Sequence, residues 1–350
     1  MLLHHATQTS ISSHPQLGAP PFVFPLSMGA STLMVISAFF ACASLQSGKP
    51  GQFLRKRLAR LVPAYLVAVL LTFAVQRWIA PEGWSQLDGR DLVYNLLLIN
   101  QWFPDIDTVD FAYWTVPVQI GAFVAGALLI KVLRNRPLRA FLWALIVTPM
   151  LLSPLVNHAE WLFRFYNGVA LHRAQLFAAG IAIFLWSRRR MSTKHLVALL
   201  AAAVVAQEFH TSETASTVGF AVLLAVVCLA AKGPDWGRSR LVTWLAGISY
   251  GVYLVHEQIG TVVMDRLAAH GFGPWSLLAG FITSAVVLGW LLTKYVERPA
   301  YRLLTQPQAG RSGTSPRRPA PSVRPVSQPS TSAPDPMTDV LAGPLSVQLR

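Results

Sequence analysis

Long apolar stretches, separated by short polar segments, run through most of this sequence. Residues 18–48 and 111–130, for example, contain no Asp, Glu, Lys or Arg. A helix needs about 20 apolar residues to cross the roughly 30 Å hydrocarbon core of a bilayer. We therefore expect an all-α, polytopic transmembrane helical bundle with nine spans, while the apolar segment 92–103 is too short to cross and is predicted to be interfacial or re-entrant. The predicted spans are 22–45, 61–80, 111–131, 140–156, 168–186, 195–207, 216–231, 241–264 and 275–295.

The composition favours a membrane protein over a soluble one. Apolar residues make up 53% of the chain, and only 13% are charged, against about 25% in ordinary soluble domains. This excludes a disordered or nucleic-acid-binding protein and argues against a soluble enzyme. The net charge of +14 falls in short clusters between apolar stretches, which suits contact with anionic membrane lipids. Cys42 and Cys228 both lie in apolar stretches, so neither a disulfide framework nor a metal site is expected.

The charges of the predicted loops alternate along the chain and indicate the topology. Basic clusters follow every second span, and the acidic residues gather in the intervening loops. Because positively charged loops stay on the cytoplasmic side, we expect a multi-pass protein of the cell membrane with a cytoplasmic C-terminus. The segments predicted to be cytoplasmic are 46–60, 132–139, 187–194, 232–240 and the tail after residue 304.

Both ends of the chain affect this topology. Nine spans with a cytoplasmic C-terminus place Met1 outside, although no signal peptide precedes the first span. Residues 1–5 resemble the end of an apolar helix, so we expect a missing upstream helix and ten spans, with an outside N-terminus as the alternative. From residue 306 the chain is rich in Pro, Ser, Gly and Arg, which predicts a disordered tail. Two regions follow: a membrane domain over 1–304 and a cytoplasmic tail over 305–350.

Two groups of polar residues beside the predicted spans could carry chemistry. His4 and His5 end an apolar run, and a histidine is the side chain best able to take a proton from a hydroxyl at neutral pH. The alternative is an interfacial pair with no role. Arg55, Arg57 and Arg60 precede the second span, where a helix start would favour a phosphorylated ligand. The commoner role of such a cluster is to anchor topology on lipid head groups.

The third predicted span also carries polar residues. At the entry to the third span, Tyr113 and Trp114 fit an aromatic interfacial belt, whereas Gln119 carries a hydrogen-bonding amide into hydrocarbon. A helix–helix hydrogen bond would also explain Gln119.

Span eight carries a polar stripe. Ser249, Tyr253 and His256 share one face of a helix, so we expect this stripe to face the bundle interior or a water-filled cavity. An interhelical hydrogen-bond network is the equally acceptable alternative.

Taken together, these segments resemble the acyltransferase 3 family of integral-membrane bacterial O-acyltransferases. The resemblance covers most of residues 1–304 and rests on four motifs in order. They are the N-terminal histidine before Met-Val-Ile-Ser-Ala-Phe-Phe at 34–40, Arg-x-x-Arg-x-x-Pro-x-Tyr at 57–65, Tyr-Trp-Thr-x-Pro-Val at 113–118, and Ser-Tyr-x-x-Tyr-Leu-x-His at 249–256 with Val-Glu-Arg-Pro at 296–299.

The resemblance implies about ten helices and an acyltransferase that uses acyl-CoA, here expected to be acetyl-CoA, as donor substrate. The acceptor would be a hydroxyl of a carbohydrate, lipid or secondary metabolite, as in O-acetylation of the bacterial cell envelope. The family's catalytic histidine matches His4 or His5, but its Arg, eleven positions earlier, would lie before Met1. A second departure is Gln119, where family members usually carry Glu, so a neutral hydrogen-bonding role fits better there.

The residues present suit acyl transfer. Transfer from a thioester needs a base for the acceptor hydroxyl and a donor for the developing oxyanion. No Gly-x-Ser-x-Gly elbow or reactive cysteine suggests an acyl-enzyme, so direct transfer is expected, with no bound cofactor and no metal. A transporter or flippase is the competing class, and a membrane scaffold a third. The candidate residues are His5, His4 and His256 for catalysis, Arg55, Arg57 and Arg60 for the donor, and Tyr113, Trp114, Gln119 and Tyr253 for substrate.

Overall fold

The computed structural model describes residues 1–45, 49–84, 86–133, 138–233 and 239–306, and these residues form helices and no strands. The predicted all-α class is therefore confirmed, and residues 307–350 of the predicted tail lie outside the described residues. The helices are α1 (Leu2–His4), α2 (Ser10–Ser13), α3 (Gly29–Leu45), α4 (Pro50–Trp78), α5 (Gly89–Leu96), α6 (Thr115–Leu133), α7 (Leu138–Leu152), α8 (Glu160–Gly168), α9 (Ala174–Ser187), α10 (Thr193–Thr211), α11 (Thr214–Lys232), α12 (Arg240–Val255), α13 (Glu257–Ala269), α14 (Pro274–Leu292) and α15 (Arg298–Thr305).

Six segments in the described residues are long and apolar enough to span a bilayer, where nine were predicted. Helices α3 and α12, at 17 and 16 residues, are apolar but shorter than the roughly 20 residues that a full crossing needs. Helix α10, at the position of the sixth predicted span, is not among the six. The six are Pro50–Trp78, Phe111–Leu129, Leu138–His158, Glu160–Ser187, Thr214–Lys232 and Pro274–Thr305.

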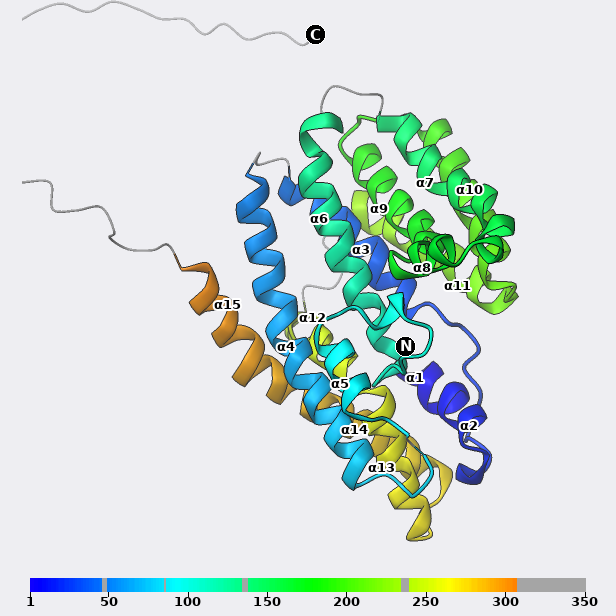
Figure 1. Cartoon of the computed structure of the whole chain (residues 1–350), viewed down its shortest axis with the longest axis vertical. Coiled ribbons are helices and arrows are strands. Elements are labelled where there is room, and N and C mark those ends of the chain that lie inside the picture. The colour runs from blue at the N-terminus through cyan, green and yellow to red at the C-terminus, as the bar shows by residue number, and fades with distance from the viewer. Residues whose placement is uncertain (46–48, 85, 134–137, 234–238, 307–350) are drawn as a thin grey trace, which may run out of the picture. The chain divides into compact units, whose positions relative to one another are not determined.

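The helices pack in two groups (Figure 1), and α3 and α6 contribute side chains to the apolar clusters of both. Helices α7, α9, α10 and α11 surround one apolar core, while α4, α12, α13 and α14 form the other group. The approach of α12 to α14 is close because glycines face each other: a Cβ on Gly251 would lie 2.3 Å from the Gly289 carbonyl oxygen. Small residues such as these allow the backbones of two membrane helices to approach closely.

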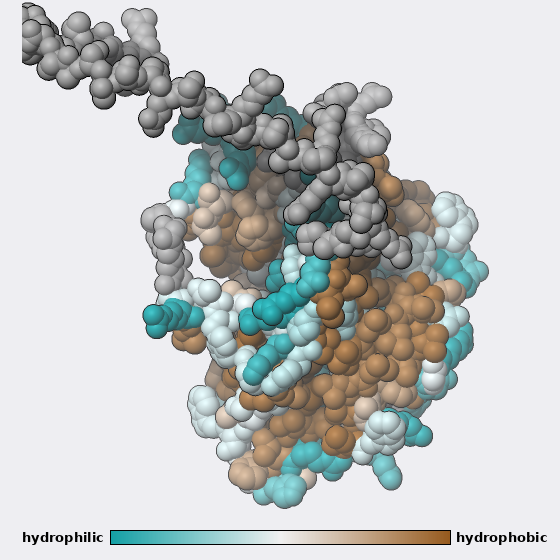
Figure 2. All heavy atoms as spheres, turned by 90° about the vertical axis from the view of Figure 1, so that its left-hand side faces the viewer, coloured by the Kyte–Doolittle hydropathy of each residue, from teal (hydrophilic) through white to brown (hydrophobic). Residues whose placement is uncertain are grey.

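Large apolar side chains cover much of the surface, as expected for helices in contact with lipid. Figure 2 shows a broad, continuous hydrophobic area on one face. Trp78, Leu128 and Leu151 are each more than two-thirds exposed, which would be unfavourable if they faced water. The chain is therefore built as a multi-pass membrane protein.

The eighth predicted span, 241–264, is not one continuous helix. The chain breaks at His256, between α12 and α13. The imidazole Nδ1 of His256 lies 2.7 Å from the Tyr253 carbonyl oxygen, and the hydroxyl of Tyr113 donates to the Leu254 carbonyl at 2.9 Å. The side chains of His256 and Tyr113 thus bind carbonyl groups at the end of α12. These carbonyl groups would otherwise need backbone N–H groups as donors. Hydropathy could not show this break because both halves are apolar.

Helix α4 also differs from its prediction, because it begins at Pro50 and not near residue 61. Proline is favoured in the first helical turn, and after Gly51 neither Gly nor Pro follows before Pro63. Arg55, Arg57 and Arg60 therefore lie inside the helix. The prediction that they occupy a helix start with free N–H groups was wrong.

Candidate active site

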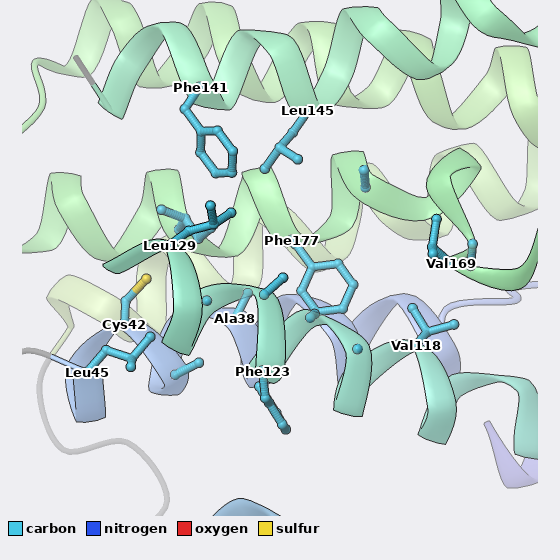
Figure 3. A pocket seen from close by; sticks show the side chains of 18 of the residues that line it. Ala38, Cys42, Leu45, Val118, Phe123, Leu129, Phe141, Leu145, Val169 and Phe177 are labelled. Atoms are coloured by element: carbon cyan, nitrogen blue, oxygen red, sulfur yellow. The ribbon is translucent and has the colours of Figure 1, made fainter. Parts of the chain in front are cut away.

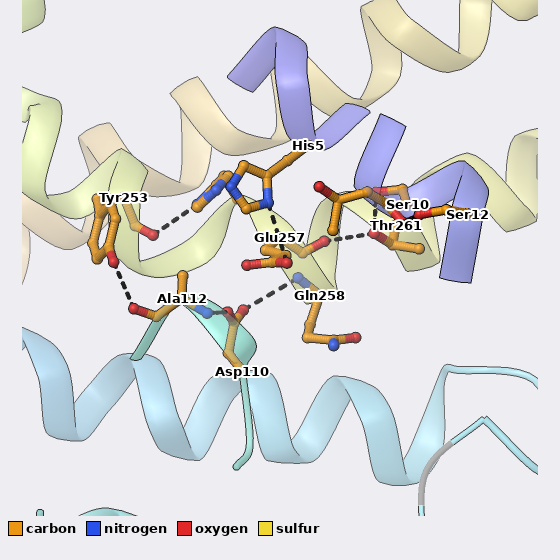
Figure 4. Close-up of polar contacts among 11 residues, drawn as sticks. His5, Ser10, Ser12, Asp110, Ala112, Tyr253, Glu257, Gln258 and Thr261 are labelled. Carbon is orange, nitrogen blue, oxygen red and sulfur yellow. Dashed lines mark hydrogen bonds and ion pairs between the residues drawn. The ribbon is translucent and has the colours of Figure 1, made fainter. Parts of the chain in front are cut away.

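A short N-terminal helical segment brings His5 against α13. Residues His5–Thr9 form a π-helical turn between α1 and α2. The hydroxyls of Ser10 and Thr261, which lie 2.7 Å apart, join the segment to α13, and Ala6 packs in one cluster with Met264 of α13 and Phe281 of α14. His5 consequently faces Glu257 at the start of α13 (Figure 4).

His5 is paired with Glu257, the first residue of α13. Its Nδ1 lies 3.1 Å from Oε1 of Glu257, which is within ion-pair distance. The two groups are not aligned as a hydrogen bond requires. The side chain of His5 is 18% exposed and that of Glu257 only 6%. The histidine is thus within reach of a substrate while its carboxylate partner is shielded from water.

His256 lies directly beside this pair. Its ring centroid is 4.8 Å from that of His5, and the side chain is fully buried. Because a carbonyl oxygen can only accept, Nδ1 of His256 must donate to Tyr253. Its Nε2 is therefore unprotonated in the neutral ring, and this atom has no hydrogen-bond partner among the described residues.

His4 has a different environment from His5. Its Nδ1 lies 3.0 Å from the Phe24 carbonyl oxygen, and the Phe24 N–H donates to the hydroxyl of Thr7. The rings of His4 and His5 are nearly perpendicular, at 85°. His4 thus joins the N-terminal segment to the chain that follows it, whereas His5 faces Glu257.

Asp110 completes the polar group, although the sequence marked it only as one acid of an outer loop. Its Oδ2 accepts from the N–H of Gln258 at 3.1 Å, and its Oδ1 accepts from Ala112 at 2.8 Å. A carboxylate at the N-terminus of α13 satisfies a backbone donor there. Burial, and then the charge of Glu257, raise the pKa of Asp110, opposed by the two N–H donors.

Glu257 was also missed as a candidate residue. The signal was present, because an acidic side chain within a predicted span is unusual and tends to be functional. Its partner could not be identified without the fold, since His5 lies at the other end of the chain.

The tyrosines predicted to bind substrate hold the framework together. The hydroxyl of Tyr113 lies 2.9 Å from that of Thr72 and donates to Leu254. Tyr253 donates to the Ala112 carbonyl at 2.5 Å and lies 2.7 Å from the hydroxyl of Thr115. Both rings are buried, so these tyrosines brace the region around the α12–α13 break.

Trp114 and Gln119 follow Tyr113 along the chain. The guanidinium of Arg173 lies 5.3 Å from the centre of the Trp114 ring, a cation–π contact. Gln119 accepts from the hydroxyl of Ser37 at 2.7 Å, a bond between α6 and α3 that matches the helix–helix alternative.

The predicted polar stripe on span eight is only partly present. Tyr253 and His256 are buried, but Ser249 is exposed and bonds its own helix at the Ala246 carbonyl. The expectation that Ser249 shares the interior face was wrong, because the helix turns that position outward.

The three arginines of the basic cluster do not converge on one point. Arg60 pairs with Glu297 at 3.2 Å. Arg55 approaches the Thr305 carbonyl at 3.4 Å, and Arg57 donates to Ser44 and packs over the rings of Phe53 and Phe123. Much of their charge is therefore already engaged, most of all that of Arg60.

A cavity of about 1560 Å³ lies between α3, α6, α7 and α9. Its wall is mostly apolar, with Cys42, Val118 and Phe177 among the residues that Figure 3 shows pointing into it. Two exposed cations, Arg139 and Arg190, also line it. Within the described part of the chain, neither His5 nor Glu257 borders this cavity, so the cavity and the histidine cluster are lined by different residues.

Comparison with known proteins agrees with the sequence motifs. The family model of the acyltransferase 3 family, described as an acyltransferase domain, matches residues 1–294. No curated protein and no solved structure matches the chain. Since the match covers most of the chain and includes the residues around His5 and Glu257, the chain belongs to the acyltransferase 3 family.

Proposed function

We propose that this protein is a membrane O-acyltransferase that moves an acetyl group from acetyl-CoA to a hydroxyl of a carbohydrate, lipid or secondary-metabolite acceptor. The observation that carries the proposal is the pairing of His5 with a shielded carboxylate, Glu257, at 3.1 Å. A base held by a carboxylate is the arrangement that activates a hydroxyl in acyl transfer. Family membership disfavours the transporter alternative.

In the proposed reaction His5 acts as the general base. Its Nε2 takes the proton of the acceptor hydroxyl as that oxygen attacks the thioester carbonyl. The C–S bond then breaks, the acetyl ester is formed, and the CoA thiolate leaves and takes up the proton that His5 received. Glu257 stabilises the imidazolium through Nδ1–H, and this contact is expected to align when substrate binds, as catalytic hydrogen bonds often do.

The nucleotide end of acetyl-CoA is proposed to bind at the apolar cavity and the cations near it, and the long pantetheine arm is proposed to carry the thioester beyond the cavity to His5. Arg139 and Arg190 line the cavity and belong to segments that the charge pattern places in the cytoplasm. Arg57 packs over two aromatic residues of the cavity wall, Phe53 and Phe123, and this nearness to the cavity supports its predicted role toward the phosphates of CoA. Arg60, tied to Glu297, is expected to contribute less.

The base is tested in membranes of cells that express the protein. Membranes are incubated with acetyl-CoA labelled in the acetyl group, and label in hydroxylamine-labile esters is counted. His5→Ala should lower the rate by roughly 10²–10⁴-fold, the usual contribution of a general base. His4→Ala should stay within a few fold, and the exposed His270 provides a control variant, His270→Ala, that should be unchanged. Full activity of His5→Ala would refute the assignment.

The donor site has its own test. The double variant Arg139→Ala/Arg190→Ala should raise KM for acetyl-CoA and leave KM for the acceptor unchanged, because charge-assisted bonds to phosphate are lost. Arg189→Ala is the matched control, since Arg189 is exposed on the same loop but does not line the cavity. An equal effect of both changes would show that only overall loop charge matters.

A further inference from the structure

We propose that His5, His256 and Glu257 form a binding site for a divalent transition-metal ion such as Zn²⁺, and that the bound ion blocks acyl transfer. The blocking effect rests on the proposed function, in which His5 is the base, whereas the binding site itself does not. The proposal stands on the positions of three ligand atoms, their burial and their missing partners.

The three side chains converge from two parts of the fold. One ligand atom from each lies within 4.8 Å of the others, and in the described residues this is the group that meets that condition. His256 and Glu257 are consecutive residues at the α12–α13 break, and His5 faces them from the N-terminal segment. A metal ion between them would therefore join that segment to α13.

The ligand atoms lack other partners. Nδ1 of His5, Nε2 of His256 and Oε2 of Glu257 are all buried without a hydrogen bond to any described residue. A buried polar atom left unpaired typically costs about 1–3 kcal/mol. Nδ1 of His5 has only the ion-pair contact with Glu257, and the other two atoms have no hydrogen bond, so a cation between the three would supply the partner that they lack.

The tautomer of His256 supports metal binding independently. Its Nδ1–H donates to the Tyr253 carbonyl, which directs the lone pair of Nε2 toward the cluster. In metal sites the ligating histidine typically donates its other N–H to a carbonyl or carboxylate in this way, which fixes the ring and its basicity. The backbone that interrupts α12 thus also orients a ligand.

The donor set indicates the kind of metal. Two imidazole nitrogens and one carboxylate oxygen suit Zn²⁺, in the pattern of three protein ligands with one open position. Ligands of tetrahedral zinc lie about 3.4 Å apart, so atoms that lie up to 4.8 Å apart must close by up to about 1.4 Å around the ion. Mg²⁺ prefers oxygen ligands and should bind poorly.

Metal on His5 would prevent its action as a base. In the proposed mechanism Nδ1 carries the proton and Nε2 accepts one from the acceptor hydroxyl. When zinc binds Nδ1, the proton of the neutral ring lies on Nε2 instead, and that nitrogen has no lone pair to offer. The ion therefore inhibits without contact with either substrate.

Zinc binding is tested on the purified full chain in detergent, by isothermal titration with ZnCl₂ after treatment with a chelator. The wild type should bind one Zn²⁺, and His256→Ala and Glu257→Gln should weaken binding at least tenfold. His270→Ala is the control and should bind as the wild type does. His256→Gln serves as a second variant if His256→Ala fails to fold. Equal zinc affinity in all variants, or equal affinity of the wild type for MgCl₂, would overturn the site.

A second readout follows the join between the N-terminal segment and α13. Zn²⁺ should slow proteolysis of the N-terminal segment in the wild type and not in His256→Ala. The same concentration of Zn²⁺ should reduce acetyl transfer by the wild type at least tenfold, and a chelator should restore it. Bound zinc without loss of activity would overturn the inhibitory part.

The two proposals fail separately. If His5→Ala keeps full transfer activity while the wild type still binds zinc, the proposed base is wrong and the metal site stands. If His5→Ala abolishes transfer while the wild type binds no zinc, the metal site is wrong and the proposed function stands.

Discussion

Glu257→Gln tests how the carboxylate contributes to catalysis. The change keeps the size and one acceptor oxygen of the side chain but removes the charge that lies 3.1 Å from Nδ1 of His5. Hydrogen bonds to charged groups contribute roughly 1.5–3 kcal/mol, which converts to a loss of roughly 10- to 150-fold in kcat. The loss falls on kcat because the imidazolium forms only as the hydroxyl gives up its proton.

The assay measures initial rates of acetyl transfer against acetyl-CoA concentration, with a chelator present so that metal plays no part. KM for acetyl-CoA should remain unchanged, since Glu257 does not border the cavity proposed for the donor. Glu160→Gln is a matched control, because Glu160 is exposed and pairs only with Arg164 in the described structure. A Glu257→Gln enzyme with wild-type kcat would refute the role of the carboxylate.

Three further predictions concern stability and topology. Gly180→Leu should destabilise the protein by about 1–3 kcal/mol, because a Cβ there would lie 2.3 Å from a backbone carbonyl of α3. Gly121→Ala is the control and should be neutral, because a Cβ at Gly121 would meet no atom within 4 Å. Equal melting temperatures of the two variants in detergent would contradict this prediction. Tyr113→Phe should cost about 1–3 kcal/mol in the same melting assay, since the buried Leu254 carbonyl loses its donor, whereas an unchanged melting temperature would mean that another group replaces it. A reporter fused at Gln86 should indicate the outer side, and a cytoplasmic signal there would refute the topology drawn from loop charge.

The class of protein and its family could be predicted from the sequence alone. Apolar stretches without charges predict membrane helices because no other regular element hides its own backbone polar groups in hydrocarbon within a single segment. The ordered motifs around His4 and His5, at 57–65, 113–118 and 249–256, predicted the family that the comparison confirmed. These properties depend on local order along the chain.

Helix boundaries and the partners of charged groups were decided by the tertiary structure. The break at His256 exists because its ring and the Tyr113 hydroxyl take carbonyls of α12. Likewise, Arg60 is engaged because Glu297, far away in the chain, reaches it. Apolar periodicity carries no information on either contact.

The candidate site shows the same division. The sequence identified His4, His5 and His256 as histidines near or within apolar helices, but it favoured His5 over His4 only slightly. Folding separates them, because His4 is bound to the Phe24 carbonyl while His5 faces Glu257. Whether a side chain is a base, a ligand or a structural link depends on what lies within about 3 Å of its atoms. Those neighbours come from helices that only the packing of the whole chain brings together.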